Sequence, residues 1–413
     1  MPSLMSRPAG TAERLSRDFA WFLAVCVLLL LPLCFIGYGS DNDTFGVLEA
    51  GRSTWHLHHP VTSRNPGYWT YEAIVYFLAR MGGHIVTNLG SLCVGAVAVW
   101  RFLVMSRRLG VRFPKLMAAC LVATPVFAIA CTSTMDYVWS LLGIVVFIEL
   151  LIADRLLLAI LPAAFAFAVR GSNGALIAGA IAGAIGGELY FRRRLTPRAL
   201  LLIGVGIAAA LLGSPPYIAS YHFAGNSMAF ARAMAGPAEM WTMKMRIGRF
   251  GYKTLYLFGP AAWVLCAAGF AVRGDAAAEA SDSVLQYRRR AVPILIGVVA
   301  MNAVLFFDWS IEISYLIPGE FFLLLLLGMT LMAKKRWLTV AFAVATLSAD
   351  FVTMQLAVPD VSGRSTSAAL QPALKPGQLL GDLNARMAVR GCETYVCWMY
   401  KNIEPSPEKP PAQ

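Results

Sequence analysis

Long runs of apolar residues, separated by short polar segments, extend through almost the whole chain. A helix of roughly 17 to 25 mainly apolar residues is long enough to cross the hydrocarbon core of a bilayer. The pattern therefore predicts an all-α polytopic membrane protein built as a bundle of about eleven transmembrane helices. These helices are expected at 20–39, 85–105, 113–132, 135–153, 155–170, 172–190, 199–219, 254–272, 291–307, 316–333 and 337–355.

Basic residues gather in short clusters between the apolar runs, and every cluster falls on one side of the membrane if the odd-numbered helices run outward. Because cytoplasmic loops carry an excess of Lys and Arg, that side is predicted to be the cytoplasm. The clusters are Arg7, Arg14 and Arg17; Arg107, Arg108, Arg112 and Lys115; Arg155; Arg192 to Arg194 with Arg198; Arg288 to Arg290; and Lys334 to Arg336.

This sidedness divides the chain into three parts. Residues 1–19 form a cytoplasmic N-terminus, 20–355 a transmembrane domain and 356–413 a tail outside the membrane. The first apolar run is long and lacks a clear small-residue cleavage site, so we interpret it as an anchor rather than a signal peptide.

Composition narrows the class of protein. The chain is 58% hydrophobic and 14% charged, which is more apolar than a soluble domain requires. Its formal net charge of +12 does not indicate a nucleic-acid partner, because the basic residues are not gathered on one soluble module. The abundance of alanine, glycine and arginine is typical of a GC-rich bacterium. We therefore expect a multi-pass protein of the bacterial inner (plasma) membrane, surrounded by membrane lipids, with a periplasmic outer face.

The longer loops lie on the outer face. The first is 40–84, within which 70–82 has helical apolar spacing and predicts an amphipathic helix in the membrane interface. The second is 220–253. The tail ends in a proline-rich stretch expected to be disordered. Cys392 and Cys397, which also lie in the tail, predict a local disulfide in an oxidising compartment.

Small residues recur at every fourth position within one predicted span, which favours close helix packing over a ligand role; they are Gly179, Gly183 and Gly187.

Three aspartates are candidates for chemistry on the outer face. Asp41 and Asp43 directly follow the first predicted span, and Asp136 lies in the tight turn between two later spans. A partly desolvated carboxylate at a membrane boundary can act as general base on a hydroxyl or amine. The alternatives are a solvated turn for the first two and a helix cap for Asp136.

Several cations share that face. A guanidinium binds phosphate oxygens bidentately, which makes Arg64 a candidate for a lipid phosphate. Arg170 lies at the outward end of a predicted span, where the positive-inside rule expects few basic residues. Further cations, which alternatively hold lipid headgroups, are Arg246, Arg249 and Lys253. The histidines at 56, 58 and 59 match no standard metal spacing, so a polar loop is favoured there over a metal site.

Three short motifs occur in order along the outer face. Asp43 is followed by Glu49 and Arg52, which have the spacing of the E-x-x-R end of a stretch like E-T-x-Y-x-E-x-x-R that follows an acid. The segment 64–69, Arg-Asn-Pro-Gly-Tyr-Trp, is similar to a K-P-x-x-Y-W element. The segment 315–318, Tyr-Leu-Ile-Pro, is similar to a Y-x-L-P element. Their order and common sidedness resemble the lipid-linked-sugar-dependent glycosyltransferases of the GT-C fold, in the branch of protein O-mannosyltransferases and aminoarabinose transferases.

The resemblance implies transfer of a monosaccharide from a polyprenyl-phosphate donor to an envelope glycan, lipid or protein acceptor. It implies Asp43 as the catalytic base, Asp136 as an acid that helps to place the acceptor, and Arg64 as a ligand of the donor phosphate. The phosphate clamp would be completed by Tyr315 and one of Arg246, Arg249 and Lys253, and the substrate loop would contain Glu49, Arg52 and Tyr68.

Departures from the family pattern leave two choices open. Thr44 follows Asp43 where relatives often have a second acid, and the extra acid, Asp41, comes earlier, so Asp41 and Asp43 both remain candidates for the base. The lysine often seen before the tyrosine motif is missing, which weakens Tyr315 as a phosphate ligand. The tail also lacks the large soluble domain that many relatives use to grip acceptors.

The main alternative function is a transporter or flippase of lipid-linked intermediates, and a structural subunit is a third. Transporters place ionisable groups near the bilayer midplane and often show inverted repeats, whereas the acids here lie at the outer boundary. No cofactor is expected. A divalent metal is not favoured, because a lipid monophosphate leaving group needs less neutralisation than a nucleotide diphosphate.

Overall fold

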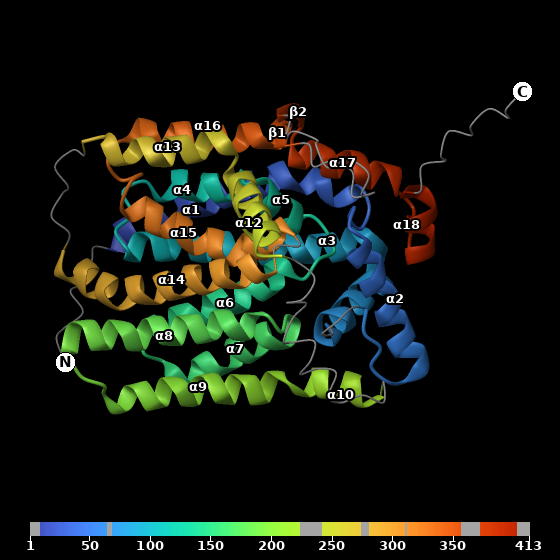
Figure 1. Cartoon of the computed structure of the whole chain (residues 1–413), viewed down its shortest axis with the longest axis horizontal. Helices are drawn as coiled ribbons and strands as arrows, with labels where there is room; N and C mark the ends of the chain where they lie inside the picture. Colours follow the sequence, from blue (N-terminus) through green and yellow to red (C-terminus); the bar gives the residue numbers. More distant parts are fainter. Residues whose placement is uncertain are drawn as a thin grey trace, which may run out of the picture.

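The computed structural model describes residues 9–63, 68–223, 242–273, 281–309, 312–356 and 372–402. Most of them form helices whose axes run along the long dimension of the molecule, with α2, α12 and α18 lying across it (Figure 1). The elements are α1 (Ala9–Leu30), η1 (Leu31–Phe35), α2 (Asn42–Leu57), α3 (Trp69–Arg108), α4 (Pro114–Val122), α5 (Pro125–Cys131), α6 (Tyr137–Ile152), α7 (Leu156–Val169), α8 (Asn173–Arg192), α9 (Pro197–Gly213), α10 (Pro215–Phe223), α12 (Met243–Phe258), α13 (Pro260–Ala271), α14 (Asp282–Asp308), η2 (Ile313–Leu316), α15 (Ile317–Met329), α16 (Arg336–Phe351), β1 (Val352–Leu356), β2 (Pro372–Pro376), α17 (Gln378–Ala388) and α18 (Tyr395–Asn402).

The apolar helices are compatible with a membrane protein. Among the described residues, 5 helical segments are long and apolar enough to cross a membrane, or up to 7 if each of two bent pairs counts as one span. The bent pairs are α4 with α5, at 73°, and α12 with α13, at 86°. The remaining apolar helices, α6, α7 and the η2–α15 segment, are shorter. The predicted count of about eleven spans is therefore not confirmed, whereas the helical class of the bundle is.

The first outer loop contains two helices. The predicted interfacial helix at 70–82 and the predicted span at 85–105 are joined in α3, which breaks at Gly82 and Gly83. Gly83 has a φ of +60°, which glycine adopts without a steric penalty. Before the break, Tyr71 and Val75 are buried while Phe77 is exposed, so this half of α3 is amphipathic as expected. It packs against α2.

The predicted glycine packing is confirmed. α8 and α14 lie side by side, and a Cβ added at Gly183 would stand 2.3 Å from the carbonyl oxygen of Pro293. Gly179 and Gly187 likewise face α14 within contact distance. Since side chains at these positions would force the two helices apart, the glycines allow the close approach of α8 to α14. The outer ends of α8 and α14 are held together next to the site described below.

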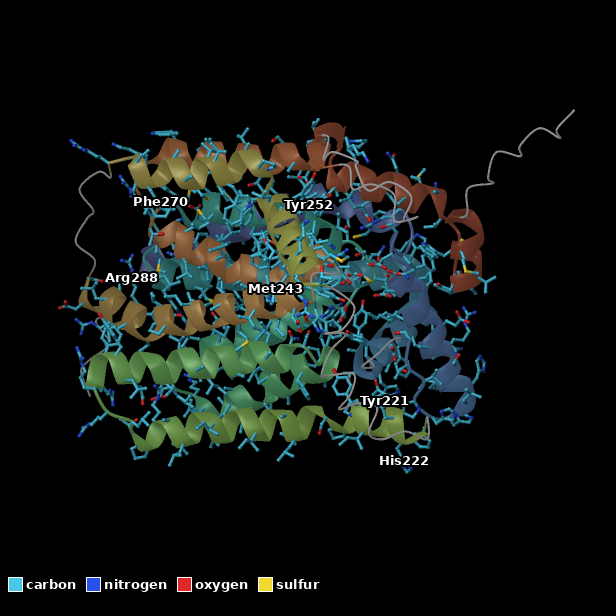
Figure 2. The ribbon with its side chains drawn as sticks, in the orientation of Figure 1. Tyr221, His222, Met243, Tyr252, Phe270 and Arg288 are labelled. Atoms are coloured by element: carbon cyan, nitrogen blue, oxygen red, sulfur yellow. A yellow bond between two sulfur atoms is a disulfide. The ribbon has the colours of Figure 1, made fainter. Side chains whose placement is uncertain are left out.

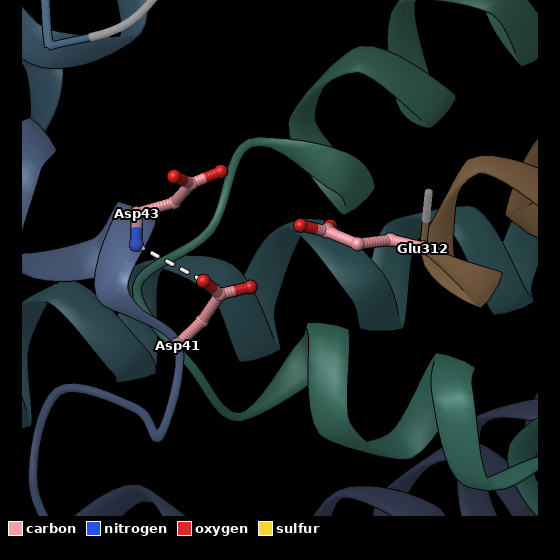
Figure 3. Close-up of side chains that lie close together, drawn as sticks. All are labelled: Asp41, Asp43 and Glu312. Atoms are coloured by element: carbon pink, nitrogen blue, oxygen red, sulfur yellow. Dashed lines mark hydrogen bonds between the residues drawn. The ribbon is translucent and has the colours of Figure 1, made fainter. Parts of the chain in front are cut away.

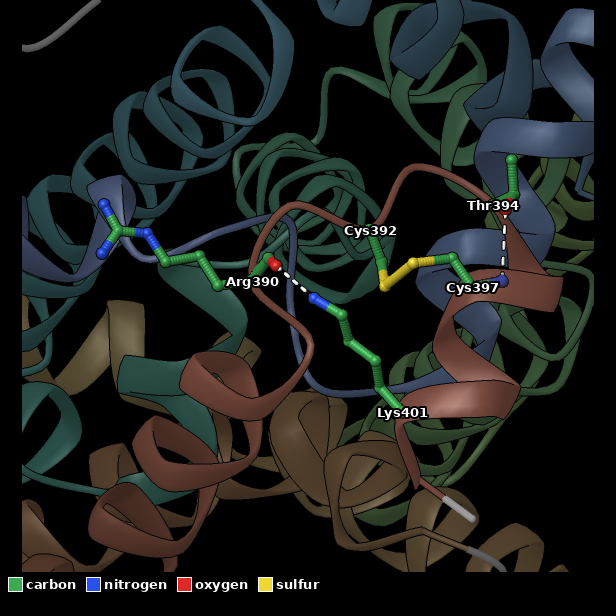
Figure 4. Close-up of a disulfide and its surroundings, with 5 residues drawn as sticks. All are labelled: Arg390, Cys392, Thr394, Cys397 and Lys401. Atoms are coloured by element: carbon green, nitrogen blue, oxygen red, sulfur yellow. Dashed lines mark hydrogen bonds between the residues drawn. A yellow bond between two sulfur atoms is a disulfide. The ribbon is translucent and has the colours of Figure 1, made fainter. Parts of the chain in front are cut away.

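A short sheet follows the helical bundle in the C-terminal part of the chain. α16 ends at Phe351, inside the last predicted span, and β1 then pairs antiparallel with β2 in a 2-stranded sheet. The chain continues into α17 and α18, which pack against α5, α16 and α2. Cys392 and Cys397 form the predicted disulfide (Figure 4). The proline-rich stretch 403–413 lies outside the described residues.

The segments predicted to lie outside come together at one end of the bundle, where α2, α10 and α18 lie (Figure 1). At this end, Asn88 of α3 donates from Nδ2 to the carbonyl oxygens of Gly37, at 2.7 Å, and Cys34, at 3.1 Å. Its Oδ1 accepts from the hydroxyl of Thr134 at 2.9 Å. Asn88 is fully buried, so these bonds tie the segment before α2 to the turn before α6.

Candidate functional site

Three carboxylates meet at the N-terminus of α2. Asp41, Asp43 and Glu312, which we call the acid cluster, each offer an oxygen within 4.8 Å of the others (Figure 3). Asp41 is the N-cap of α2 and accepts from the backbone N–H of Asp43 at 3.0 Å, while Asp43 lies in the first turn. Glu312 precedes η2, far away in the sequence. All three are partly exposed, so the cluster is open to a ligand.

The two aspartates have different local roles. Asp at an N-cap satisfies an otherwise unpaired backbone N–H, and this is the structural role of Asp41. Asp43 lies in the first turn of α2. Because the capping role falls to Asp41, Asp43 is the better candidate for chemistry, although both belong to the cluster.

A cavity of about 550 Å³, the main cavity, opens beside the acid cluster. Its wall includes Asp41, Glu312 and Lys253, so it combines carboxylates with one ammonium group. Lys253 and Tyr252 come from α12, which crosses the bundle; Figure 2 shows Tyr252 and Met243 along this helix. The opposite wall is formed by α17. A polar ligand bound here would contact both signs of charge.

Asp43 faces a second cavity of about 460 Å³, the outer cavity, between α2, residues 61–63 and α18. Its lining is rich in hydroxyl and carboxylate groups, and among the residues that the structure describes the polar ones are Asn42, Asp43, Glu49, Ser53, Thr62, Ser63 and Tyr395. Because Asp41 lines the main cavity and Asp43 the outer one, the acid cluster stands where the two cavities approach each other.

A buried ion pair lies next to the acid cluster. Arg170, at the C-terminal end of α7, donates from Nη1 to both oxygens of Asp136, at 3.0 and 2.9 Å. Asp136 is completely buried, and its side chain does not cap α6. The helix-cap alternative for Asp136 is therefore wrong: its carboxylate instead compensates the buried charge of Arg170.

The guanidinium of Arg170 is surrounded by aromatic rings. Its central carbon lies 4.4 Å from the ring centre of Tyr315, 4.5 Å from that of Tyr137 and 5.7 Å from that of Tyr68. Such cation–π contacts stabilise a desolvated guanidinium. Tyr137 connects the two groups of charges, because its hydroxyl donates to a carboxylate oxygen of Glu312.

Arg170 also lines a third cavity of about 180 Å³, the apolar cavity, at the outer ends of α8 and α14. Its wall is mostly aliphatic and aromatic, with Leu176, Phe306 and Trp309 among the lining residues. Tyr137 and Ser314 line both this cavity and the main cavity, so the two share a wall. A ligand with an anionic group between an apolar and a polar part fits this arrangement.

The structure brings together some of the predicted phosphate ligands. Arg170 and Tyr315 face the apolar cavity, and Lys253 faces the main cavity. Arg246 is paired instead with Asp308 of α14. Arg249 lies on α12 but lines none of the three cavities. Arg64 lies outside the described residues.

The predicted substrate-loop residues separate. Glu49 lines the outer cavity and Tyr68 covers Arg170. Arg52 instead forms an exposed ion pair with Glu393 of the tail, at 3.8 Å. Exposed pairs of this kind add at most about 1 kcal/mol.

Sequence reasoning missed Glu312 and the whole contribution of α17. The only signal for Glu312 was its place beside the tyrosine motif at 315–318, in a short outer loop. For α17 the signal was an acid–base pair at helical spacing, Asp382 and Arg386, in a segment expected to be a simple tail.

Comparisons with family models, curated proteins and solved structures find no match for this chain. Function must therefore be argued from the site itself.

The acid cluster has the composition of a divalent-cation site, because carboxylate oxygens are the ligands preferred by Mg²⁺ and Ca²⁺. The nearby cations Lys253 and Arg170 offer another way to neutralise a phosphate monoester. For the sugar transfer that the sequence predicts, we expect an unchanged rate in excess EDTA, measured with labelled lipid-linked sugar in washed membranes. Loss of the reaction in EDTA, restored by Mg²⁺ or Mn²⁺, would contradict this and would assign a cation to the cluster.

Proposed function

We propose that this chain is a membrane glycosyltransferase that moves a monosaccharide from a polyprenyl-phosphate donor to an acceptor. The observation that carries the proposal is the convergence, around Tyr137, of the acid cluster and the buried Arg170 where a polar and an apolar cavity share a wall. A polyprenyl-phosphate sugar has the same sequence of parts: an apolar chain, an anion and a polar sugar. The distribution of basic residues along the sequence supports a site on the periplasmic face of a bacterial inner membrane.

The donor is placed by its charge and polarity. The apolar cavity receives the first prenyl units, and the phosphate lies between Arg170 and Lys253. Asp136 accepts from the Nη1 nitrogen of Arg170, so the carboxylate orients the guanidinium that binds the phosphate oxygens. The sugar then extends into the main cavity beside Asp41.

The acceptor enters through the outer cavity, where Asp43 takes the proton of its hydroxyl or amine. The acceptor oxygen or nitrogen attacks the anomeric carbon, and the bond from that carbon to the phosphate oxygen breaks. Its electron pair stays on the polyprenyl phosphate, whose growing negative charge is stabilised by Arg170 and Lys253. Proton removal by Asp43 and attack on the sugar beside Asp41 thus take place on the two sides of the acid cluster.

Transport of a lipid-linked intermediate is the second candidate. One feature favours it: Glu320 is completely buried within α15, and buried carboxylates inside apolar helices commonly mark transport or proton pathways. Glu320 lines none of the three cavities described above, whereas the acid cluster, Lys253 and Arg170 do. The transferase proposal therefore accounts for more of the charged groups at the outer end.

The proposal is tested in cells by mass spectrometry of surface glycans from a strain that lacks this chain. We expect one monosaccharide to disappear from a single class of envelope glycan, lipid or protein. Complementation with the wild-type gene should restore it, and complementation with D43N should not. An unchanged glycan profile in the deletion strain would contradict the proposal.

A further inference from the structure

Arg386 of α17 is a completely buried arginine in the tail. Its Nη1 donates to the carbonyl oxygen of Thr132, at 2.7 Å, and to that of Leu33, at 3.4 Å. Its Nη2 donates to the carbonyl oxygen of Ile129 at 3.4 Å. These carbonyls lie at the C-terminal ends of α5 and η1, where a helix leaves its last carbonyl groups without partners and favours a cation.

Asp382, one turn earlier on α17, connects this arginine to the acid cluster. Its Oδ2 lies 2.6 Å from the Nε of Arg386, and its Oδ1 accepts from the hydroxyl of Ser40 at 2.6 Å. Ser40 directly precedes Asp41, the N-cap of α2. The indole N–H of Trp398 in α18 donates to the carbonyl oxygen of Ser40 at 3.0 Å. Two helices of the tail therefore hold the residue that enters α2.

α17 is also a wall of the main cavity. The lining residues that it supplies are Gln378, Gly381, Asp382 and Ala385. Gln378 donates to the carbonyl oxygen of Tyr256 at 3.0 Å, which joins this wall to α12, the helix that carries Lys253. The tail thus contacts both the acidic and the basic side of the cavity.

A planar guanidinium suits this position better than an ammonium. It meets three backbone carbonyls and one carboxylate in different directions at once, which the fixed fork of donors in arginine allows. The Asp382–Arg386 pair is buried, and Asp382 also lines the main cavity. The side chain of Ser40 is linked to the pair by one hydrogen bond.

We propose that Asp382 and Arg386 are positioning residues: they fix Ser40 and, through it, the N-cap Asp41 and the acid cluster in the geometry that transfer requires. The inference rests on the proposed glycosyltransferase function. It makes α17 a part of the catalytic unit rather than an appendage outside the membrane domain. The reaction is sensitive to small displacements of a base, so loosening this connection lowers turnover more than it lowers donor affinity.

The test compares steady-state transfer by full-length purified variants in proteoliposomes. S40A removes the hydrogen bond to Asp382 without creating a buried charge, and we expect kcat to fall about tenfold with little change in the KM for donor. S40T keeps a hydroxyl and should recover most of the lost kcat. R386K should lower kcat more strongly. The control is R390K, because Arg390 is exposed and follows α17 (Figure 4), and this variant should transfer sugar at the wild-type rate.

Outcomes separate this inference from the proposed function. If the wild type transfers sugar but S40A and R386K retain its kcat, the positioning role is wrong and the proposed function stands. If S40A and S40T lose kcat equally, the hydroxyl contact is not the cause, and the inference is again contradicted. If the wild type transfers no sugar to any acceptor, the proposed function itself fails. Size-exclusion profiles and thermal unfolding of each variant identify loss of fold as distinct from loss of turnover.

Discussion

D43N is expected to lower kcat for sugar transfer by about 10²- to 10⁴-fold, the contribution typical of a general base. Asparagine keeps the size and hydrogen-bonding shape of the side chain but accepts no proton. The N-cap of α2 is Asp41 and not Asp43, and asparagine retains the polar surface of the side chain, so the fold should survive the change. The measurement is single-turnover transfer of labelled sugar with saturating donor, because this reports the chemical step rather than donor binding.

D41N is the matched control. Asparagine is about as good an N-cap as aspartate, so this variant retains the bond to the N–H of Asp43. We expect a much smaller loss of kcat than for D43N. The reverse order, with D41N inactive and D43N active, would assign the base to Asp41. Full activity in both variants would contradict proton transfer by either aspartate.

R170M is expected to have the second largest effect, and it should act on both stability and activity. It leaves the completely buried carboxylate of Asp136 without its cation, which typically costs about 3–5 kcal/mol. It also removes the guanidinium that we assign to the donor phosphate, and losing a group of this kind costs about 10²- to 10³-fold in rate. Thermal unfolding in detergent and the transfer assay report the two losses separately.

The double variant R170M/D136N distinguishes structural from functional loss. Neutralising both partners removes the unpaired charge, so stability should recover most of the way to the wild type. Transfer should stay as low as in R170M alone, because the phosphate still lacks its guanidinium. Recovery of both stability and transfer would show that Arg170 only supports the fold.

Local features of the fold were accessible from the sequence because they depend on neighbouring residues. The small-residue spacing predicts the approach of α8 to α14, and the spacing of Cys392 and Cys397 predicts their disulfide. The polar exit after the first apolar run places Asp41 and Asp43 just beyond that run, but the helix α2 that begins there was not predicted.

Bends and the number of spans were not accessible. An apolar run indicates that a segment is shielded from water, but it does not indicate where the helix axis bends. α4 and α5 share one run, yet they are bent by 73° at Pro125, which cannot donate the hydrogen bond that would continue α4. α12 and α13 meet at 86° around Gly259, whose φ is +80°. With each bent pair counted as one span the total is 7, and the other four predicted spans correspond to the shorter helices α6, α7, η2–α15 and α16.

The composition of the candidate site depends on contacts between distant segments. Glu312 joins Asp41 and Asp43 because η2 lies against α5 and α12 at the same end of the bundle. The pairing of Asp136 with Arg170 could not be predicted from the sequence for the same reason, because the two residues are distant in the chain and each was interpreted separately as a candidate site residue. α17 reaches Ser40 across 342 positions of the sequence, and no local pattern indicates that contact.

The central claim is that the acid cluster and Arg170 form the two sides of one sugar-transfer site. Its most direct test is transfer by purified protein in liposomes supplied with labelled polyprenyl-phosphate hexoses and pentoses and with envelope acceptors. We predict that one of these donors yields glycosylated product and free polyprenyl phosphate in equal amounts, and that D43N and R170M/D136N yield neither. Movement of intact donor lipid across the bilayer with no product and no released polyprenyl phosphate would contradict the account.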